Sequence, residues 1–232
     1  MRLKYLLPVL LAAGLSSAAL ANPYETTLKN GLRIIVKEDH RAPTAVQMVW
    51  YRIGSTDEVD GASGVAHVLE HMMFKGTPNV GPGEFNKRVA AAGGRDNAFT
   101  SRDYTAYFQQ VPTEKLEDVM QLEADRMRHL NVDAKEFEQE IKVVMEERRM
   151  RTDDNPQAKL FEQMNAVAFQ AHPYRRPIIG WMNDLETMTA ADAKAWYDTW
   201  YVPNNAYVVI TGDVDHKAVF ALAEKYYGPL EG

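Results

Sequence analysis

The chain has 232 residues, with 32 acidic and 26 basic side chains and a formal net charge of −6 at pH 7. This acidic balance argues against a nucleic-acid partner and weakly favours cationic ones. The sequence contains no cysteine, which excludes disulfides and lipid attachment through an N-terminal cysteine. A chain without disulfides depends on its hydrophobic core, or on a metal, for stability.

The first residues have the pattern of a secretory signal peptide. Arg2 and Lys4 precede an apolar run, and small residues ending at Ala21 follow it. We therefore expect residues 1–21 to be cleaved after Ala21, leaving residues 22–232 as one exported, periplasmic domain. The apolar run is too short to cross a bilayer comfortably, and no later segment is long and apolar enough, so we expect no membrane span in the mature chain.

Strand patterns dominate the first part of the mature chain. Two extended runs flank Asn30-Gly31, a dipeptide that favours a tight hairpin turn. Residues 44–55 alternate apolar and other side chains, which predicts a third strand. Residues 96–112 predict two further strands joined by a polar turn. We expect Ser63 to cap a helix over residues 64–75, and Gly93-Gly94 to end a second short helix.

Helical patterns dominate the remainder of the chain. We expect helices to begin at or near five polar residues, namely Thr113, Asp133, Asn155, Thr189 and Asp215, with a capping signature at Asp133 and at Asn155-Pro156. The helix that starts at Asp133 is expected to run to about Arg151, and residues 205–214 predict a buried strand. This order of elements predicts an α+β fold: a mixed, largely antiparallel sheet with helices packed on it.

The stretch GVAHVLEHMMFKGT suggests a metal site. His67 and His71 are four residues apart, so on a helix both rings can reach one ion. Glu70 lies on nearly the same face, too close to be an easy third ligand but well placed to reach a water on the metal. Zinc with three protein ligands and one water is the catalytic arrangement. The alternative is a surface helix with two solvated histidines.

A third ligand must come from another segment, and EFEQEIKVVMEERRMR is the obvious source. Glu140 and Glu147 are seven residues apart on one helical face, and Glu146 is the competing choice. Glutamates next to arginines on a long helix are more often a solvated, ion-paired face. Spacing alone does not choose among these three glutamates.

At these motifs the sequence resembles the pitrilysin/insulinase family of inverted zinc metallopeptidases, the inverzincins. The nearer likeness is to the branch of the mitochondrial processing peptidase and its short bacterial relatives. The resemblance covers nearly the whole mature chain and implies one half-domain of that family's fold. It includes, in order, GSTDE, GVAHVLEHMMFKGT, GGRDNAFTSRDYTAYFQQVP, EQEIKVVMEERR, HPYRRPIIG and YVPNNAYVVITGDV.

The resemblance implies a role for each residue that matches the family motif. His67, His71 and Glu147 match the zinc ligands, and Glu70 matches the general base. Glu140 matches a family glutamate that assists catalysis without binding the metal, and it can act partly as an acidic partner for a metal-bound histidine. Zn²⁺ is the implied cofactor.

The resemblance also implies a mode of substrate binding. In the family, the NAFTS segment is an edge strand that pairs with an extended substrate. Asn97, Ala98 and Phe99 would then hold a peptide across the zinc through main-chain hydrogen bonds. Without the family, these residues read as an ordinary strand and turn. Arg175 and Arg176 read as solvated loop charges.

One departure from the family concerns length. Members of this branch have two homologous halves, and the sequence contains only the zinc half. We therefore expect a zinc-dependent endopeptidase for extended or unfolded peptides that needs a second half or a partner subunit for full activity. The alternative is a non-catalytic peptide-binding or scaffold subunit. A purely structural zinc site is disfavoured, because such sites usually have four protein ligands, often cysteines.

Overall fold

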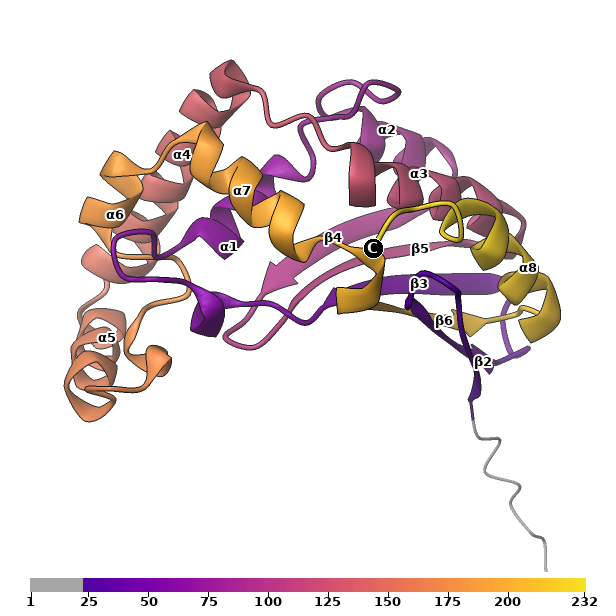
Figure 1. The fold of residues 1–232 in the computed structure, drawn as a ribbon, viewed down its shortest axis with the longest axis horizontal. Coiled ribbons are helices and arrows are strands. Elements are labelled where there is room, and N and C mark those ends of the chain that lie inside the picture. The colour runs from indigo at the N-terminus through magenta and orange to yellow at the C-terminus, as the bar shows by residue number, and fades with distance from the viewer. Residues whose placement is uncertain (1–22) are drawn as a thin grey trace, which may run out of the picture.

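The computed structural model describes residues 23–232, so the predicted signal peptide lies outside the described residues. Its centre is a sheet with the strand order β1-β2-β6-β3-β5-β4 (Figure 1). The strands are β1 (Tyr24–Thr27), β2 (Arg33–Glu38), β3 (Thr44–Tyr51), β4 (Arg95–Thr100), β5 (Thr105–Pro112) and β6 (Ala206–Gly212). Only β2 and β6 are parallel neighbours within this sheet. The predicted mixed, largely antiparallel sheet is confirmed.

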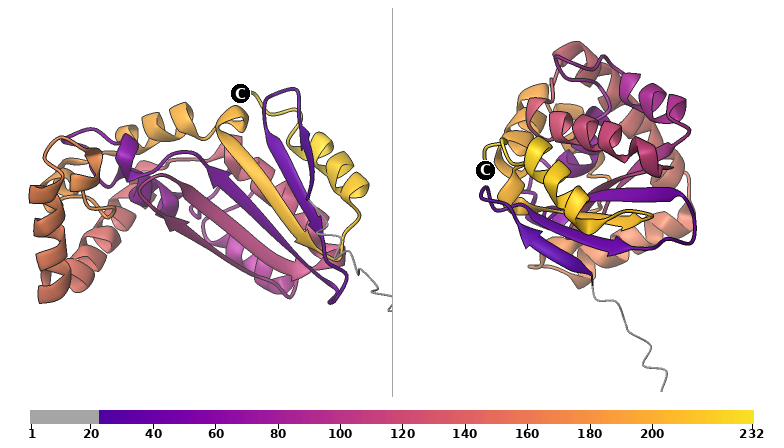
Figure 2. Two further views of the ribbon diagram at one scale, coloured as in Figure 1. Left: turned by 90° about the horizontal axis from the view of Figure 1, so that it is seen from below. Right: turned by 90° about the vertical axis from the view of Figure 1, so that its right-hand side faces the viewer.

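The helices lie on one side of this sheet and beyond one end of it (Figure 2). They are α1 (Val65–Met72), α2 (Glu84–Ala91), α3 (Leu116–His129), α4 (Ala134–Arg148), α5 (Pro156–Ala168), α6 (Met182–Thr187), α7 (Ala190–Trp200) and α8 (His216–Tyr226). α1, α2, α3 and α8 contact the strands, and α4 to α7 gather beside α1 at the end of the sheet. The described residues contain no helix long and apolar enough to span a membrane.

Alternation along the strands explains why the helices pack where they do. Every second side chain of β3 is buried, including Ala45, Val49 and Tyr51, which gives the period of two expected for a sheet with one covered face. Beneath the helices, the buried Arg126 pairs with Glu123, with 2.6 Å between Nη2 and Oε2. This pair lies within α3, and its outward contacts hold the helix in place. Glu123 accepts a hydrogen bond from Gln109 of β5, and the Arg126 guanidinium stacks on the rings of Phe74, Phe85 and Tyr107.

The start of α1 differs from the expectation. Ser63 does not cap the helix, because its hydroxyl donates to the buried Asp184 and accepts from the backbone N–H of Trp181. The carboxyl group of Glu58 takes the capping role instead: its two oxygens accept the backbone N–H groups of Gly64 and Ala66, both at 2.9 Å. The helix is also shorter than residues 64–75.

Two other local expectations need correction. The helix that starts after Asp133 ends at Arg148 and continues as a wider π-helical turn, Arg149–Asp153. The short helix α6 was not expected from the sequence at all. Both features depend on contacts with distant segments: Arg148 bonds the backbone oxygen of Gly180, and Asp184 of α6 bonds Ser63.

Candidate metal centre

Helix α1 presents its polar residues to a cavity because its apolar residues are buried. Val65, Val68, Leu69 and Met72 belong to the core. His67, Glu70 and His71 are spaced three and four residues apart, so they share the other face of the helix. The apolar pattern of the helix therefore determines which way these three side chains point.

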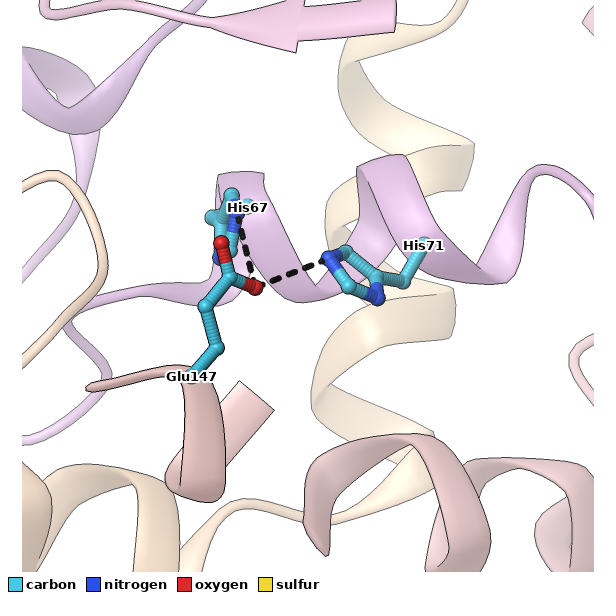
Figure 3. Close-up of side chains that lie close together, drawn as sticks. All are labelled: His67, His71 and Glu147. Carbon is cyan, nitrogen blue, oxygen red and sulfur yellow. Dashed lines mark ion pairs between the residues drawn. The ribbon is translucent and has the colours of Figure 1, made fainter. Parts of the chain in front are cut away.

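Glu147, near the end of α4, completes a three-residue group with the two histidines. Its Oε2 lies 3.9 Å from His67 Nε2 and 3.4 Å from His71 Nε2. One ligand-type atom from each residue lies within 4.8 Å of the others. Figure 3 shows both rings approaching the carboxylate from α1. Two imidazoles and one carboxylate, with no fourth protein ligand among the described residues, form the donor set of a zinc site that keeps one position open.

The electrostatics of the two histidines differ. Burial, together with the charges of His71 and Arg151, lowers the pKa of His67 to about 3, so this ring is neutral and able to bind a metal. Burial also lowers the pKa of His71, but the hydrogen bond to Glu140 and the charges of Glu140, Glu147 and Glu70 outweigh burial and raise it overall. The carboxylates next to His71 thus favour positive charge at this ring, whether it comes from a proton or from a bound cation.

Glu140 lies behind His71 rather than in the three-residue group. Its Oε2 is 3.0 Å from His71 Nδ1, and its Oε1 is 2.5 Å from Lys75 Nζ. The hydrogen bond to His71 and the interactions with Lys75 lower the pKa of Glu140 despite its partial burial. A carboxylate on Nδ1 leaves Nε2 free and orients the ring, which is the usual support for a metal-binding histidine.

Glu70 stands beside the histidines without joining the ligand group. Burial raises the pKa of its carboxyl group, while the hydrogen bond that Thr100 Oγ1 donates to Glu70 Oε2 opposes this shift. Sequence reasoning missed Thr100, although it follows Phe99 directly in the segment that the family resemblance singled out. A buried carboxylate held in this way is poised to exchange a proton.

The two histidines, Glu70 and Glu147 line a cavity of about 770 Å³, bounded on one side by β4. β4 is the last strand of the described sheet, so its outer edge has no strand partner there. Asn97, Ala98 and Phe99 line the same cavity as His67, His71, Glu70 and Glu147, whereas Glu140 does not. Glu146 lies away from the group, exposed and paired with Arg149 at 3.0 Å.

The loop that carries Arg175 and Arg176 corrects the expectation of solvated charges. Arg176 is only 7% exposed and donates to the backbone oxygens of Thr56 and Glu58. Its Nη1 also lies 3.0 Å from Asp60 Oδ1. Arg176 therefore holds the segment that supplies Glu58 to the first turn of α1. The pair of arginines gave no sign of this in the sequence, because their partners lie more than a hundred residues away.

A second group with metal-ligand chemistry, Glu38, Asp215 and His216, occurs at the start of α8. His216 Nδ1 already pairs with Glu38 at 2.8 Å, and Asp215 caps the helix by accepting the N–H of Ala218. A helix N-terminus carries partial positive charge and disfavours a cation. These contacts indicate that Glu38, Asp215 and His216 form an ion-paired helix cap and not a metal site.

Comparison with known proteins agrees with this geometry. Residues 33–181 match the model of the family described as "Insulinase (Peptidase family M16)", and residues 187–232 match that described as "Peptidase M16 inactive domain". The zinc protease PqqE of Helicobacter pylori is 38% identical over 99% of this chain and 52% of its own length. Mitochondrial-processing peptidase subunit beta of Lentinula edodes is 32% identical over 88% of this chain and 44% of its own.

Solved structures show the same fold. A protease from Helicobacter pylori superposes with a TM-score of 0.89 at 39% identity, covering 91% of this chain and 51% of that one. The periplasmic protease PqqL from Escherichia coli gives a TM-score of 0.84 at 27% identity, covering 91% and 24%. The chain thus spans about half the length of the curated relatives it matches.

Proposed function

The chain belongs to the insulinase family, peptidase family M16, and on this premise we propose that it is the catalytic domain of a zinc metallo-endopeptidase acting on extended or unfolded peptides. The observation that carries the proposal is the convergence of His67, His71 and Glu147, with Glu70 beside them, in one cavity along a free strand edge. The names of the relatives, which include several zinc proteases, support both the hydrolase activity and the cofactor.

His67, His71 and Glu147 would hold the ion. Zinc bound there supplies a Lewis acid that polarises the scissile carbonyl and lowers the pKa of water. Glu70 accepts the proton of the attacking water on Oε1, the oxygen that Thr100 does not bond, and later donates it to the leaving amine. Its burial favours the protonated form between these two steps. Glu140 assists from behind by orienting His71.

The free edge of β4 can bind a peptide substrate through its main chain, largely independently of the amino-acid sequence of the substrate. A peptide laid alongside Asn97, Ala98 and Phe99 would form main-chain hydrogen bonds with the strand and cross the cavity that contains Glu70. Only an extended segment can add to a strand edge, so folded regions of a protein would be poor substrates. Cleavage within an extended segment makes the enzyme an endopeptidase.

The enzyme also needs a second half. The relatives are about twice as long as the matched region, which supports a second homologous half or a partner subunit. The face of α5 that carries Leu160, Met164 and Val167 is the surface we assign to it, because these side chains are 64%, 51% and 70% exposed. Residues 22–232 would then be the catalytic domain of a periplasmic protein, the location named for the relative PqqL.

The substitution Glu70→Gln tests the catalytic proposal. Gln keeps the shape of the side chain but cannot accept the proton, so we expect turnover of a quenched fluorescent peptide to fall by roughly 10²- to 10⁴-fold while zinc remains bound. Glu138→Gln, an exposed change on α4, is the matched control. Hydrolysis by Glu70→Gln at the wild-type rate would contradict the assignment.

A non-catalytic, peptide-binding subunit is the second candidate, favoured by the half-length coverage of the relatives. The two functions separate when the catalytic domain is assayed together with its second half. Peptide binding without zinc-dependent cleavage in that assembly would favour the subunit role. Cleavage that is lost on chelation and restored by zinc would favour the enzyme.

A further inference from the structure

The cavity of the candidate metal centre is more positive than the chain around it. Its charged lining includes the three glutamates Glu70, Glu147 and Glu162. It also includes four arginines, Arg102, Arg151, Arg175 and Arg176. A bound zinc ion would add two further positive charges. The whole chain, by contrast, has a net charge of −6. The field inside a cleft governs which charges enter it, so the overall acidity is a poor guide to the substrate.

Arg102 differs from the other three arginines because no carboxylate in the described residues pairs with it. Arg151 Nη1 lies 2.5 Å from Glu147 Oε1, and Arg175 and Arg176 both pair with Asp60. Asp103, the acidic neighbour of Arg102 in sequence, is already bonded by the hydroxyls of Tyr174 and Thr56.

The guanidinium of Arg102 is held in place without being neutralised. Its Cζ lies 4.9 Å from the centre of the Tyr174 ring, which restricts the side chain. Its Nε is buried and has no hydrogen-bond acceptor. Because Nε is closed off from solvent, a carboxylate from a ligand would have to bond the terminal nitrogens of the guanidinium, Nη1 and Nη2.

Arg102 lies next to the path that a peptide bound along β4 would follow. β4 ends at Thr100, and Arg102 lies in the turn that leads to β5. Asn97 to Thr100 and Arg102 line one cavity. A peptide that pairs with the edge of β4 and continues past its C-terminal end would therefore pass Arg102.

We propose that Arg102 forms a subsite for a carboxylate side chain, so that peptides with Asp or Glu beyond the C-terminal end of β4 are preferred. The guanidinium matches a carboxylate in a bidentate geometry that neither an amide nor a lysine side chain can reproduce. This inference rests on the proposed peptidase function, because it assumes that a peptide lies along β4. It makes Arg102 a specificity residue, with no part in proton transfer.

The test measures binding to the full-length protein carrying Glu70→Gln, so that bound peptides are not cleaved. A fluorescein-labelled extended peptide with one Glu scanned along it is compared with its Gln and Lys counterparts by fluorescence anisotropy. We expect the Glu peptide of the best register to bind about tenfold more tightly than the Gln peptide, as for a charge-assisted hydrogen-bonded pair. Added salt should reduce this difference.

Three variants in the Glu70→Gln background separate specificity from structure. Arg102→Gln should abolish the preference for Glu over Gln, and Arg102→Glu should turn it into a preference for Lys. Arg95→Gln is the matched control, since Arg95 lies at the other end of β4 and bonds Gln110. It should leave the preference unchanged.

The outcomes distinguish failure of the Arg102 subsite from failure of the proposed peptidase function. Binding of all peptides with equal affinity, or an equal loss for all of them in Arg102→Gln, would overturn the subsite and leave the peptidase proposal standing. Failure of every extended peptide to bind would contradict the proposed function itself, and the subsite with it.

Discussion

At the scale of single residues, His71 is positioned between two glutamates of α4. Glu140 contacts Nδ1 and Glu147 faces Nε2. We expect Glu140→Gln to weaken zinc affinity at least about tenfold, because loss of the carboxylate reduces both the orientation and the basicity of the ring. Competition with a chromophoric chelator measures this. Glu138→Gln, exposed on the same helix, should leave the affinity unchanged, and an equal affinity in the two variants would refute the role.

Glu58 allows a pH prediction away from the ligands. It is 3% exposed, and burial raises its pKa to about 8 although the amides of Gly64 and Ala66 and the charge of Arg176 oppose the shift. Between its ordinary 4.5 and 8, the folded protein holds a proton that the unfolded chain has released. The contribution of this bound proton to the free energy of unfolding is therefore fully present below pH 4.5 and is lost as the pH rises through 8.

The substitution Glu58→Gln removes this titration. We expect the free energy of unfolding of the wild type, minus that of Glu58→Gln, to fall steadily as the pH is raised from about 5 to 8. Urea denaturation at a series of pH values measures the difference. A difference that stays constant or rises across this range would show that the buried carboxyl group is ionised in the folded protein.

How far the sequence could predict the site depends on which residues share an element. His67, Glu70 and His71 lie within one helical turn, so their common face could be deduced from spacing alone. Glu140, Glu146 and Glu147 could not be distinguished, because the choice depends on how α4 rotates against α1. The structure leaves Glu146 in solvent beside Arg149. The roles of Glu147 as a metal ligand and of Glu140 as the partner of His71 stay predictions.

At the scale of the element, the first turn of α1 requires a glycine. Gly64 has a φ of +90°, and a Cβ there would lie 2.6 Å from the backbone oxygen of Ile179 and 2.9 Å from Gly180 Cα. Gly61 has almost the same φ, +91°, with nothing within 4 Å. The same substitution at Gly61 and at Gly64 therefore distinguishes the energetic cost of a left-handed backbone from the cost of a steric clash.

We expect Gly61→Ala to cost about 1–2 kcal/mol through the left-handed backbone alone. Gly64→Ala should cost clearly more, and it should also weaken zinc binding, because relief of the collision must shift the helix that carries His67. Chemical denaturation and zinc titration of the two variants measure these effects. Equal losses of stability would indicate that the loop at Ile179 moves aside freely.

Local patterns predicted most elements but not their tertiary contacts. The hairpin at Asn30-Gly31, the alternation in β3, the cap at Asn155 and the helix start near Asp215 are all confirmed. The residue type and position of Ser63 predict a helix cap. Nothing local to the sequence indicates that Asp184 takes its hydroxyl, or that Glu58 replaces it.

At the scale of the molecule, α5 is, among the α-helices of residues 23–232, the one with no buried side chain. None of its residues is buried, and Leu160 and Met164 are both more than half exposed. The helix itself lies at the end of the molecule away from most of the sheet (Figure 1). The pattern at Asn155-Pro156 predicted the helix, but its exposure is a property of the packed domain. An apolar face of this kind is typical of an interface.

If the second half covers this face, charges placed there should weaken the assembly. We expect the double variant Leu160→Lys/Met164→Lys to lose co-purification with a co-expressed second half while the domain stays folded by circular dichroism. Val59→Lys is the control, because Val59 is 66% exposed elsewhere. Retention of the second half by the double variant would assign the interface to another surface.

We propose that His67, His71 and Glu147 together hold one catalytic zinc ion. The most direct measurement is the zinc content of the purified protein by mass spectrometry, for the wild type, Glu147→Gln and Glu146→Gln. We expect one zinc ion per chain in the wild type and in Glu146→Gln, and a marked loss in Glu147→Gln. Loss of zinc from Glu146→Gln with retention in Glu147→Gln, or a wild type that binds none, would contradict this assignment of the ligands.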